Sequence, residues 1–103
     1  MKTLIEAARQ AAFRAVREER EKQVEQFPPE VDIQQVETSL LDTAGLLTAY
    51  IGKISDQGIE QRAGRIVDHV EVAKNFTIVA AIAVAMTEAL LAKGDVQPRD
   101  LRD

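Results

Sequence analysis

The rarest metal-binding residue type in this sequence is histidine, which occurs once, as His69. Asp68 and Glu71 lie close to it in the sequence, but neighbouring residues of a helix point in different directions and cannot share one metal ion. A carboxylate metal site in a helical bundle needs Glu-x-x-His pairs on several helices, and the sequence has no such pair. We therefore expect no metal ion and no cofactor, and we place His69 beside the apolar side of its helix.

Glu88 borders the longest apolar stretch of the chain, which makes it the other candidate for chemistry. A buried carboxylate at this position would suit a general acid or base. However, the residues that flank it on its side of the helix are Val84 and Leu91, and no second titratable group lies within about a turn. A serine triad needs a histidine, and the chain has one histidine in all. We expect no catalytic residues and a protein that is not an enzyme.

Three arginines near the N-terminus, Arg14, Arg17 and Arg20, recur at intervals of three and are candidate phosphate contacts. Glutamates are interleaved with them, and Arg14–Glu18 has the i, i+4 spacing of an ordinary helix ion pair. The rest of the chain is acidic, with seven Lys/Arg against twelve Asp/Glu in residues 27–103. Phosphate binding needs clustered positive charge, so nucleic-acid binding is the alternative and not the favoured interpretation.

The composition is that of one globular domain of 103 residues, with no cysteine and a net charge of −4. A chain without cysteine has no disulfide, thiolate nucleophile or cysteine-ligated metal, which fits a reducing compartment. The N-terminal sequence MKTLIEAARQ becomes polar at Glu6 and Arg9 before a signal-peptide apolar region develops. We therefore expect a cytoplasmic protein.

The first predicted helix begins at Leu4, because Thr3 and Glu6 form a T-x-x-E capping box. It ends at the sequence FPPE, residues 27–30, since proline lacks an amide donor and restricts the residue before it. Apolar positions are sparse on this helix and its second half is strongly charged, so part of its apolar surface is available to a partner. The predicted partner-binding residues are Phe13, Val16, Val24 and Phe27.

A second helix is predicted after a cap formed by Asp32 and Gln35. Its apolar residues recur at steps of three and four, the pattern of one buried helix face. This seam consists of Ile33, Val36, Leu40, Ala44, Leu47, Ile51 and Ile54. The segment IGKISDQG, residues 51–58, contains two glycines and two capping residues, and so it predicts a turn.

The stretch FTIVAAIAVAMTEALLA, residues 76–92, is almost wholly apolar. Its uninterrupted part is shorter than the roughly 20 residues of a membrane span, so we expect a buried helix and no membrane contact. A helix from about Asp56 to a stop near Gly94 is roughly 55 Å long, whereas a domain of this size is about 30–35 Å across. Such a helix either breaks, near Asn75, or extends against a second copy of the chain.

The apolar seam of this last helix is rich in alanine, which favours close approach between helices of different copies. We therefore expect a homo-oligomer, either a dimer or a tetramer. The predicted oligomer interface consists of Ile59, Ile66, Val70, Ala73, Thr77, Ala80, Val84 and Leu91.

The sequence as a whole predicts an all-α protein: a helical hairpin or bundle of three to four helices with a long, largely buried C-terminal helix, assembled as an oligomer. We expect an amphipathic charged helix at 1–27, a helical-hairpin core and oligomerisation region at 28–94, and a poorly ordered charged tail at 95–103. Such a protein self-associates and binds another protein, as an adaptor, chaperone or inhibitor. The alternative is a nucleic-acid-associated regulator that contacts phosphates through its arginine-rich first helix, and an enzyme or metal carrier based on His69 or Glu88 ranks last.

Overall fold

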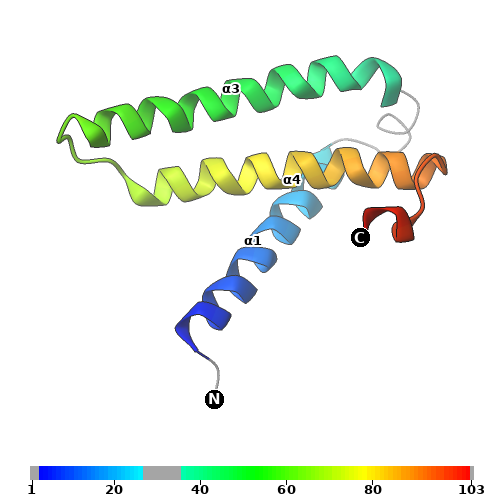
Figure 1. Ribbon diagram of the computed structural model, residues 1–103, viewed down its shortest axis with the longest axis horizontal. Helices are drawn as coiled ribbons and strands as arrows, with labels where there is room; N and C mark the ends of the chain where they lie inside the picture. The colour runs from blue at the N-terminus through cyan, green and yellow to red at the C-terminus, as the bar shows by residue number, and fades with distance from the viewer. Residues whose placement is uncertain (1–2, 27–35, 103) are drawn as a thin grey trace.

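The described part of the chain, residues 3–26 and 36–102 of a computed structural model, is helical and contains no strand. Three α-helices, α1 (Leu4–Gln26), α3 (Val36–Arg62) and α4 (His69–Lys93), are followed by a short 3-10 helix, η1 (Pro98–Leu101). Figure 1 shows α3 and α4 side by side and antiparallel, with α1 crossing α4 and its N-terminal end pointing away from them. The predicted all-α class is confirmed.

Local capping determines where α1 begins and where α4 ends. The backbone N–H of Glu6 donates to Oγ1 of Thr3 over 3.1 Å, and α1 begins at Leu4 as predicted. Gly94 has a φ of 89° and closes α4 by donating its N–H to the carbonyl of Leu91. A left-handed residue of this kind is a common helix stop and favours glycine. The predicted stop at Gly94 is confirmed.

The turn between the two long helices lies later in the chain than the sequence predicts. Helix α3 continues through Gly52 and Gly58, so the predicted turn at 51–58 is wrong. A glycine inside a helix costs only about 1 kcal/mol, which packing of α3 along α4 readily offsets. The predicted cap at Asp32 and Gln35 lies outside the described residues.

The hairpin turn is made at Gly64, whose φ is 86°. The N–H of Gly64 donates to the carbonyl of Gln61, and the N–H of Arg65 donates to the carbonyl of Glu60, each over 3.0 Å. This is the Schellman arrangement, in which a left-handed glycine closes the last helical turn. Side chains of Arg65 and Glu60 then form an ion pair of 2.6 Å across the turn.

Helix α4 begins immediately after this turn because Asp68 caps it. One carboxylate oxygen of Asp68 accepts from the N–H groups of Val70 and Glu71, at 2.9 and 3.3 Å. The break that the long apolar pattern required therefore falls at 63–68 and not near Asn75, which lies inside α4. The D-x-x-E spacing of Asp68 and Glu71 is a capping signal present in the sequence.

The prediction that the last helix is buried nearly all round is wrong. Within the described residues only four side chains of α4 are buried: Asn75, Ala81, Ile82 and Ala89. Of its most apolar 18-residue window, 22% is buried. By length and composition alone, α4 is also long and apolar enough to cross a membrane, a test that core helices of globular proteins pass as well. The physical reason for the low burial is that α3 and α1 cover only two of its sides.

The side of α3 that packs on α4 also differs from the predicted seam. The partly buried positions are Thr43, Leu47, Tyr50, Ile54, Gln57 and Glu60. The amide of Asn75 donates to Oε1 of Gln57 over 3.3 Å. Two predicted seam residues, Leu47 and Ile54, belong to this side. Leu40, Ala44 and Ile51 are exposed instead, and the first two seam residues, Ile33 and Val36, have side chains outside the described set.

The shape that results is open for a chain of this length. The radius of gyration is 16.1 Å, compared with about 13 Å for a compact domain of this size. Beyond α4, residues 98–101 of the charged tail form the 3-10 helix η1, where Asp100 accepts from the backbone N–H of Gln97 over 2.9 Å.

Candidate functional site

The candidate site is built around the point where α1 crosses α4. Small residues are buried in this part of α4: Ala81 has no exposed surface, and Ala89, about two turns further along the helix, is also buried. Small side chains allow two helix backbones to approach, because no long side chain separates them. Hollows remain on both sides of the crossing, and each has a different character.

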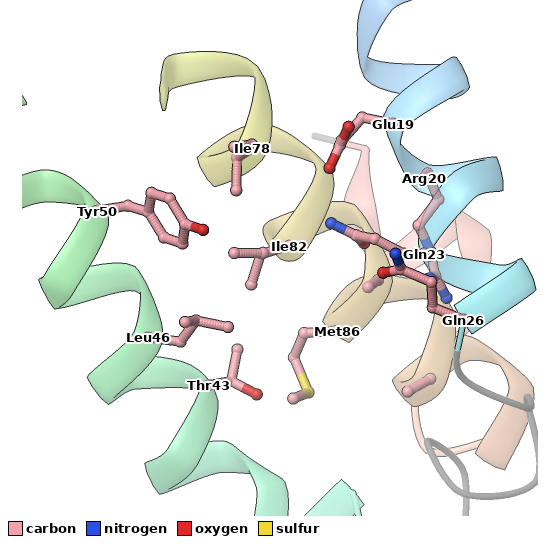
Figure 2. Close-up of a pocket in the computed structure, with 12 residues that line it drawn as sticks. Glu19, Arg20, Gln23, Gln26, Thr43, Leu46, Tyr50, Ile78, Ile82 and Met86 are labelled. Atoms are coloured by element: carbon pink, nitrogen blue, oxygen red, sulfur yellow. The ribbon is translucent and has the colours of Figure 1, made fainter. Parts of the chain in front are cut away.

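The three-helix hollow lies between α1 and α3 above α4, and has a volume of about 310 Å³. Figure 2 shows the hydroxyl of Tyr50 and the amide of Gln23 directed into it from opposite walls. Its floor is apolar and its α1 wall is polar. The lining residues are Glu19, Arg20, Gln23, Gln26, Thr43, Leu46, Tyr50, Ile78, Ile82, Ala85, Met86 and Ala89. An apolar floor with a hydrogen-bonding rim is suited to binding.

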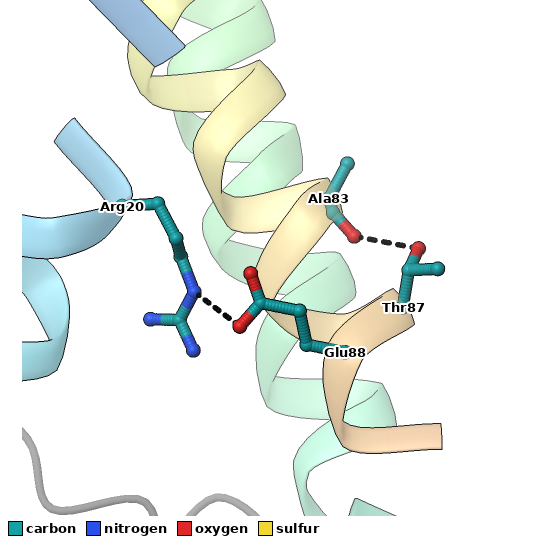
Figure 3. A network of polar contacts seen from close by, with 4 residues as sticks. All are labelled: Arg20, Ala83, Thr87 and Glu88. Carbon is teal, nitrogen blue, oxygen red and sulfur yellow. Dashed lines mark hydrogen bonds and ion pairs between the residues drawn. The ribbon is translucent and has the colours of Figure 1, made fainter. Parts of the chain in front are cut away.

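An ion pair ties α1 to α4 beside this hollow. Nε of Arg20 lies 3.1 Å from Oε2 of Glu88, and the two side chains are 12% and 49% exposed (Figure 3). The sequence offered no partner for Glu88, because its partner lies 68 residues away on another helix. Arg20 is thus turned toward α4, while Arg14 and Arg17, the other two candidate phosphate contacts, are exposed.

A second hollow, which we call the α1–α4 groove, lies on the other side of the crossing. Three of the four predicted partner-binding residues line it together: Phe13, Val16 and Val24. Phe13 is 67% exposed, and Phe27 lies outside the described residues. Val84 forms the α4 wall, and charged side chains surround the apolar centre. These are Arg17, Arg20, Glu21, Glu25 and Glu88.

His69 is the first residue of α4 and is exposed. It lines a shallow hollow with Lys74 of its own helix and Lys22 of α1. Within residues 3–26 and 36–102, no three histidine, aspartate or glutamate side chains come close enough together to hold a metal ion.

The predicted oligomer interface does not form one continuous helical seam, because the chain turns at Gly64. Ile59 belongs to α3 and Ile66 to the turn, where it is fully exposed. The remaining members stay together along one side of α4, with side chains that are exposed or partly buried. These are Val70, Ala73, Thr77, Ala80, Val84 and Leu91.

The three-helix hollow is the feature that the sequence did not predict. Leu46 and Tyr50 widen the apolar stripe of α3, which signals a broad face, but nothing local indicates that α1 provides the opposite wall. No protein-family model, characterised protein or solved structure matches this chain significantly.

Proposed function

We propose that this is a non-enzymatic helical protein that self-associates and binds another protein, in the manner of an adaptor, chaperone or inhibitor. The observation that supports this proposal is the exposed area. The chain exposes 8139 Å², whereas a compact monomer of 11.4 kDa exposes about 5,800 Å². The excess, on the order of 2,000 Å², is more than the roughly 800 Å² that each partner contributes to a standard interface.

The quality of the exposed surface supports the same proposal. Among the described residues, the buried apolar core consists of Ala81, Ile82 and Ala89 alone. A core this small provides little hydrophobic stabilisation for one chain. Meanwhile large apolar side chains such as Leu41 and Phe76 remain exposed on the two hairpin helices. Association removes these side chains from water and supplies the burial that the single chain lacks.

The polar groups at the helix crossing also fit a binding protein better than an enzyme. Arg20 and Glu88 pair with each other and join two helices, and the amides of Gln23 and Gln26 line the rim of a hollow. Such groups donate and accept hydrogen bonds but have no acid–base role in this arrangement. The α1–α4 groove, which exposed Phe13 lines, is the surface we assign to the protein partner.

Light scattering of the purified chain over a concentration series tests the self-association. We expect a mass of two or four times 11.4 kDa that persists on dilution. A chain that stays monomeric at every concentration contradicts the proposal. For the partner, Phe13→Glu is expected to abolish capture while leaving the mass unchanged, and capture that instead collapses with added salt favours the nucleic-acid alternative.

A further inference from the structure

The hairpin has two broad sides, and α1 packs against one of them, through its contact with α4. Successive residues of a helix are rotated by about 100°, which places every residue relative to the line of contact. On α4, Ala81 and Glu88 mark the side that meets α1, and Asn75 and Ile82 mark the side that meets α3. The sector left over carries Phe76, Ala80, Ala83 and Thr87.

A matching strip runs along α3. It is rotated by about a quarter turn from the positions that pack on α4, in the direction of increasing residue number. On α4, the uncovered strip is likewise displaced around the helix from the residues that contact α3, again in the direction of increasing residue number. Because the helices are antiparallel, these rotations bring both strips to the same side of the hairpin, opposite α1. We call this side the open hairpin face. It comprises Leu40, Ala44, Thr48 and Ile51 of α3 and Phe76, Ala80, Ala83 and Thr87 of α4.

Figure 3 confirms the position of the α4 strip. Ala83 and Thr87 lie on one side of α4, and the pair of Arg20 and Glu88 lies on the other. Leu40, Ile51 and Phe76 are each more than half exposed, so within the described residues little covers the face.

The open hairpin face carries no charged residue from Leu40 to Gln61 on α3, nor from Val70 to Ala92 on α4. The charges of α3 lie on its opposite flank, about a quarter turn from the positions that pack on α4 in the direction of decreasing residue number: these are Asp42, Lys53, Asp56 and Glu60. On a helix surface exposed to water, an uncharged strip about 30 Å long is unusual, because solvated faces are normally polar. This uncharged composition is typical of a helix face that is covered by another apolar face.

The two threonines of the face present no free hydroxyl donor. Oγ1 of Thr48 donates to the carbonyl of Ala44 over 2.8 Å, and Oγ1 of Thr87 donates to the carbonyl of Ala83 over 2.9 Å. Each hydroxyl is satisfied within its own helix, so burial of these residues leaves no unpaired donor. These two threonines can therefore be dehydrated at little polar cost.

We propose that a second copy of this chain covers the open hairpin face, so that two hairpins pack face to face as a four-helix bundle. This inference rests on the proposed self-association and specifies its surface. Such a face is compatible with a two-fold symmetric dimer, in which the same patch on each copy contacts its counterpart on the other. The face combines small residues, Ala80 and Ala83, with bulkier ones, Ile51 and Phe76, so that large side chains of one copy can pack against small residues of the other. The excess exposed area exceeds what such an interface requires.

This arrangement leaves the α1–α4 groove free. That groove lies on the covered side of the hairpin, and the partner copy binds the opposite side. A dimer thus presents two grooves, one on each outer side, to a protein partner.

A lipid bilayer is the competing occupant, and the packing of α3 argues against it. Helix α3 runs along α4 and is held there by the bond between Gln57 and Asn75. Insertion of α4 either breaks this contact or takes Asp42, Lys53 and Asp56 into the hydrocarbon, which is costly.

The test compares charged substitutions on the two sides of the hairpin. Ala83→Glu and Thr48→Glu place like charges across the proposed two-fold interface, whereas Ala49→Glu and Phe13→Glu place the same charge on the charged flank of α3 and in the α1–α4 groove. All four positions are exposed in the single chain, so a folded monomer tolerates each change. Circular dichroism checks that the helix content is kept.

We expect both open-face variants to weaken association by on the order of 100-fold or more, so that light scattering gives the monomer mass, while both controls keep the wild-type mass. If the wild type is an oligomer that Phe13→Glu dissociates and Ala83→Glu does not, this inference is overturned while self-association stands. If the wild type is a monomer in solution that binds lipid vesicles, both proposals are overturned.

Discussion

The two sides of the helical hairpin are both rich in small apolar residues, yet they differ in charge. The side that meets α1 carries an ion pair, Arg20–Glu88, and polar side chains that line the three-helix hollow. The open hairpin face has no charge from Leu40 to Gln61 or from Val70 to Ala92, and the hydroxyls of its two threonines are already satisfied. The fold thus contains an interface between α1 and α4 that has charged residues at its edge, and an apolar face that none of the described helices covers.

This difference indicates how each side recognises its neighbour. Arg20 and Glu88 lie at the edge of the α1 crossing, where a charged pair specifies register at modest energetic gain. The open hairpin face has no such pair, so its recognition depends on shape and on burial of apolar area. The contact within the chain and the contact that we propose between chains are both apolar. They differ mainly in whether charged residues lie beside them.

The largest expected effect comes from the buried core of α4. Ile82→Ala removes one of the few buried apolar side chains and is expected to lower the free energy of unfolding by about 2–3 kcal/mol at any protein concentration. The matched change on the open hairpin face is Ile51→Ala, whose side chain is 54% exposed. Its cost is expected to be under about 1 kcal/mol in dilute protein and to grow with concentration, since association is linked to stability.

Urea unfolding followed by circular dichroism at a low and a high protein concentration measures both variants. If Ile51→Ala shows no dependence on concentration, the two sides do not differ in the way that we describe.

A smaller effect on stability is expected at the hairpin turn. This turn sets the register of α3 on α4, and so it determines which residues lie on each side of the hairpin. Gly64 has a φ of 86°, so Gly64→Ala is expected to cost about 1 kcal/mol from backbone strain. Gly45→Ala is the control, because Gly45 lies inside α3 and is expected to gain about 0.5–1 kcal/mol from helix propensity. An added Cβ meets no atom within 4 Å at either position, so backbone conformation alone distinguishes them.

Thermal unfolding of the two glycine variants gives this comparison directly. A Gly64→Ala variant as stable as Gly45→Ala would show that the turn does not require a left-handed residue.

The smallest expected effect is the coupling between Arg20 and Glu88. A double-mutant cycle with Arg20→Gln and Glu88→Gln is expected to give about 0.2–1 kcal/mol, because half of the Glu88 side chain is exposed to solvent. Added salt should reduce this coupling and leave the oligomer mass unchanged, since the open hairpin face carries no charge. An oligomer that dissociates in high salt would mean that charged residues hold it together.

Much of the secondary structure follows from local chemistry and was predictable. The Thr3 cap and the left-handed Gly94 define helix ends through a few neighbouring atoms, so the sequence indicates them correctly. The turn at Gly64 was also encoded, by a glycine followed by the Asp68 cap, but glycines at 52 and 58 gave a competing signal. Because the helix propensity of a single glycine is a weak effect, packing of α3 against α4 decided which glycine forms the turn.

Two features of the candidate site were not predictable because they join distant segments. Phe13, Val16 and Val24 were selected as an apolar set on one helix, and the structure adds the α4 wall at Val84. The bond from Arg20 to Glu88 depends on the angle at which α1 crosses α4, which no local pattern contains.

By itself, the sequence determined that this chain is helical, where α1 begins and α4 ends, and that its last helix is too apolar to remain in water on every side. Those properties depend on interactions between residues a few positions apart. The tertiary structure alone decided that Leu47 and Ile54 face α4 while Leu40 and Ile51 do not, and that one side of the hairpin stays uncovered. Periodicity defines an apolar stripe, but which part of a wide stripe is buried depends on where the neighbouring helix lies.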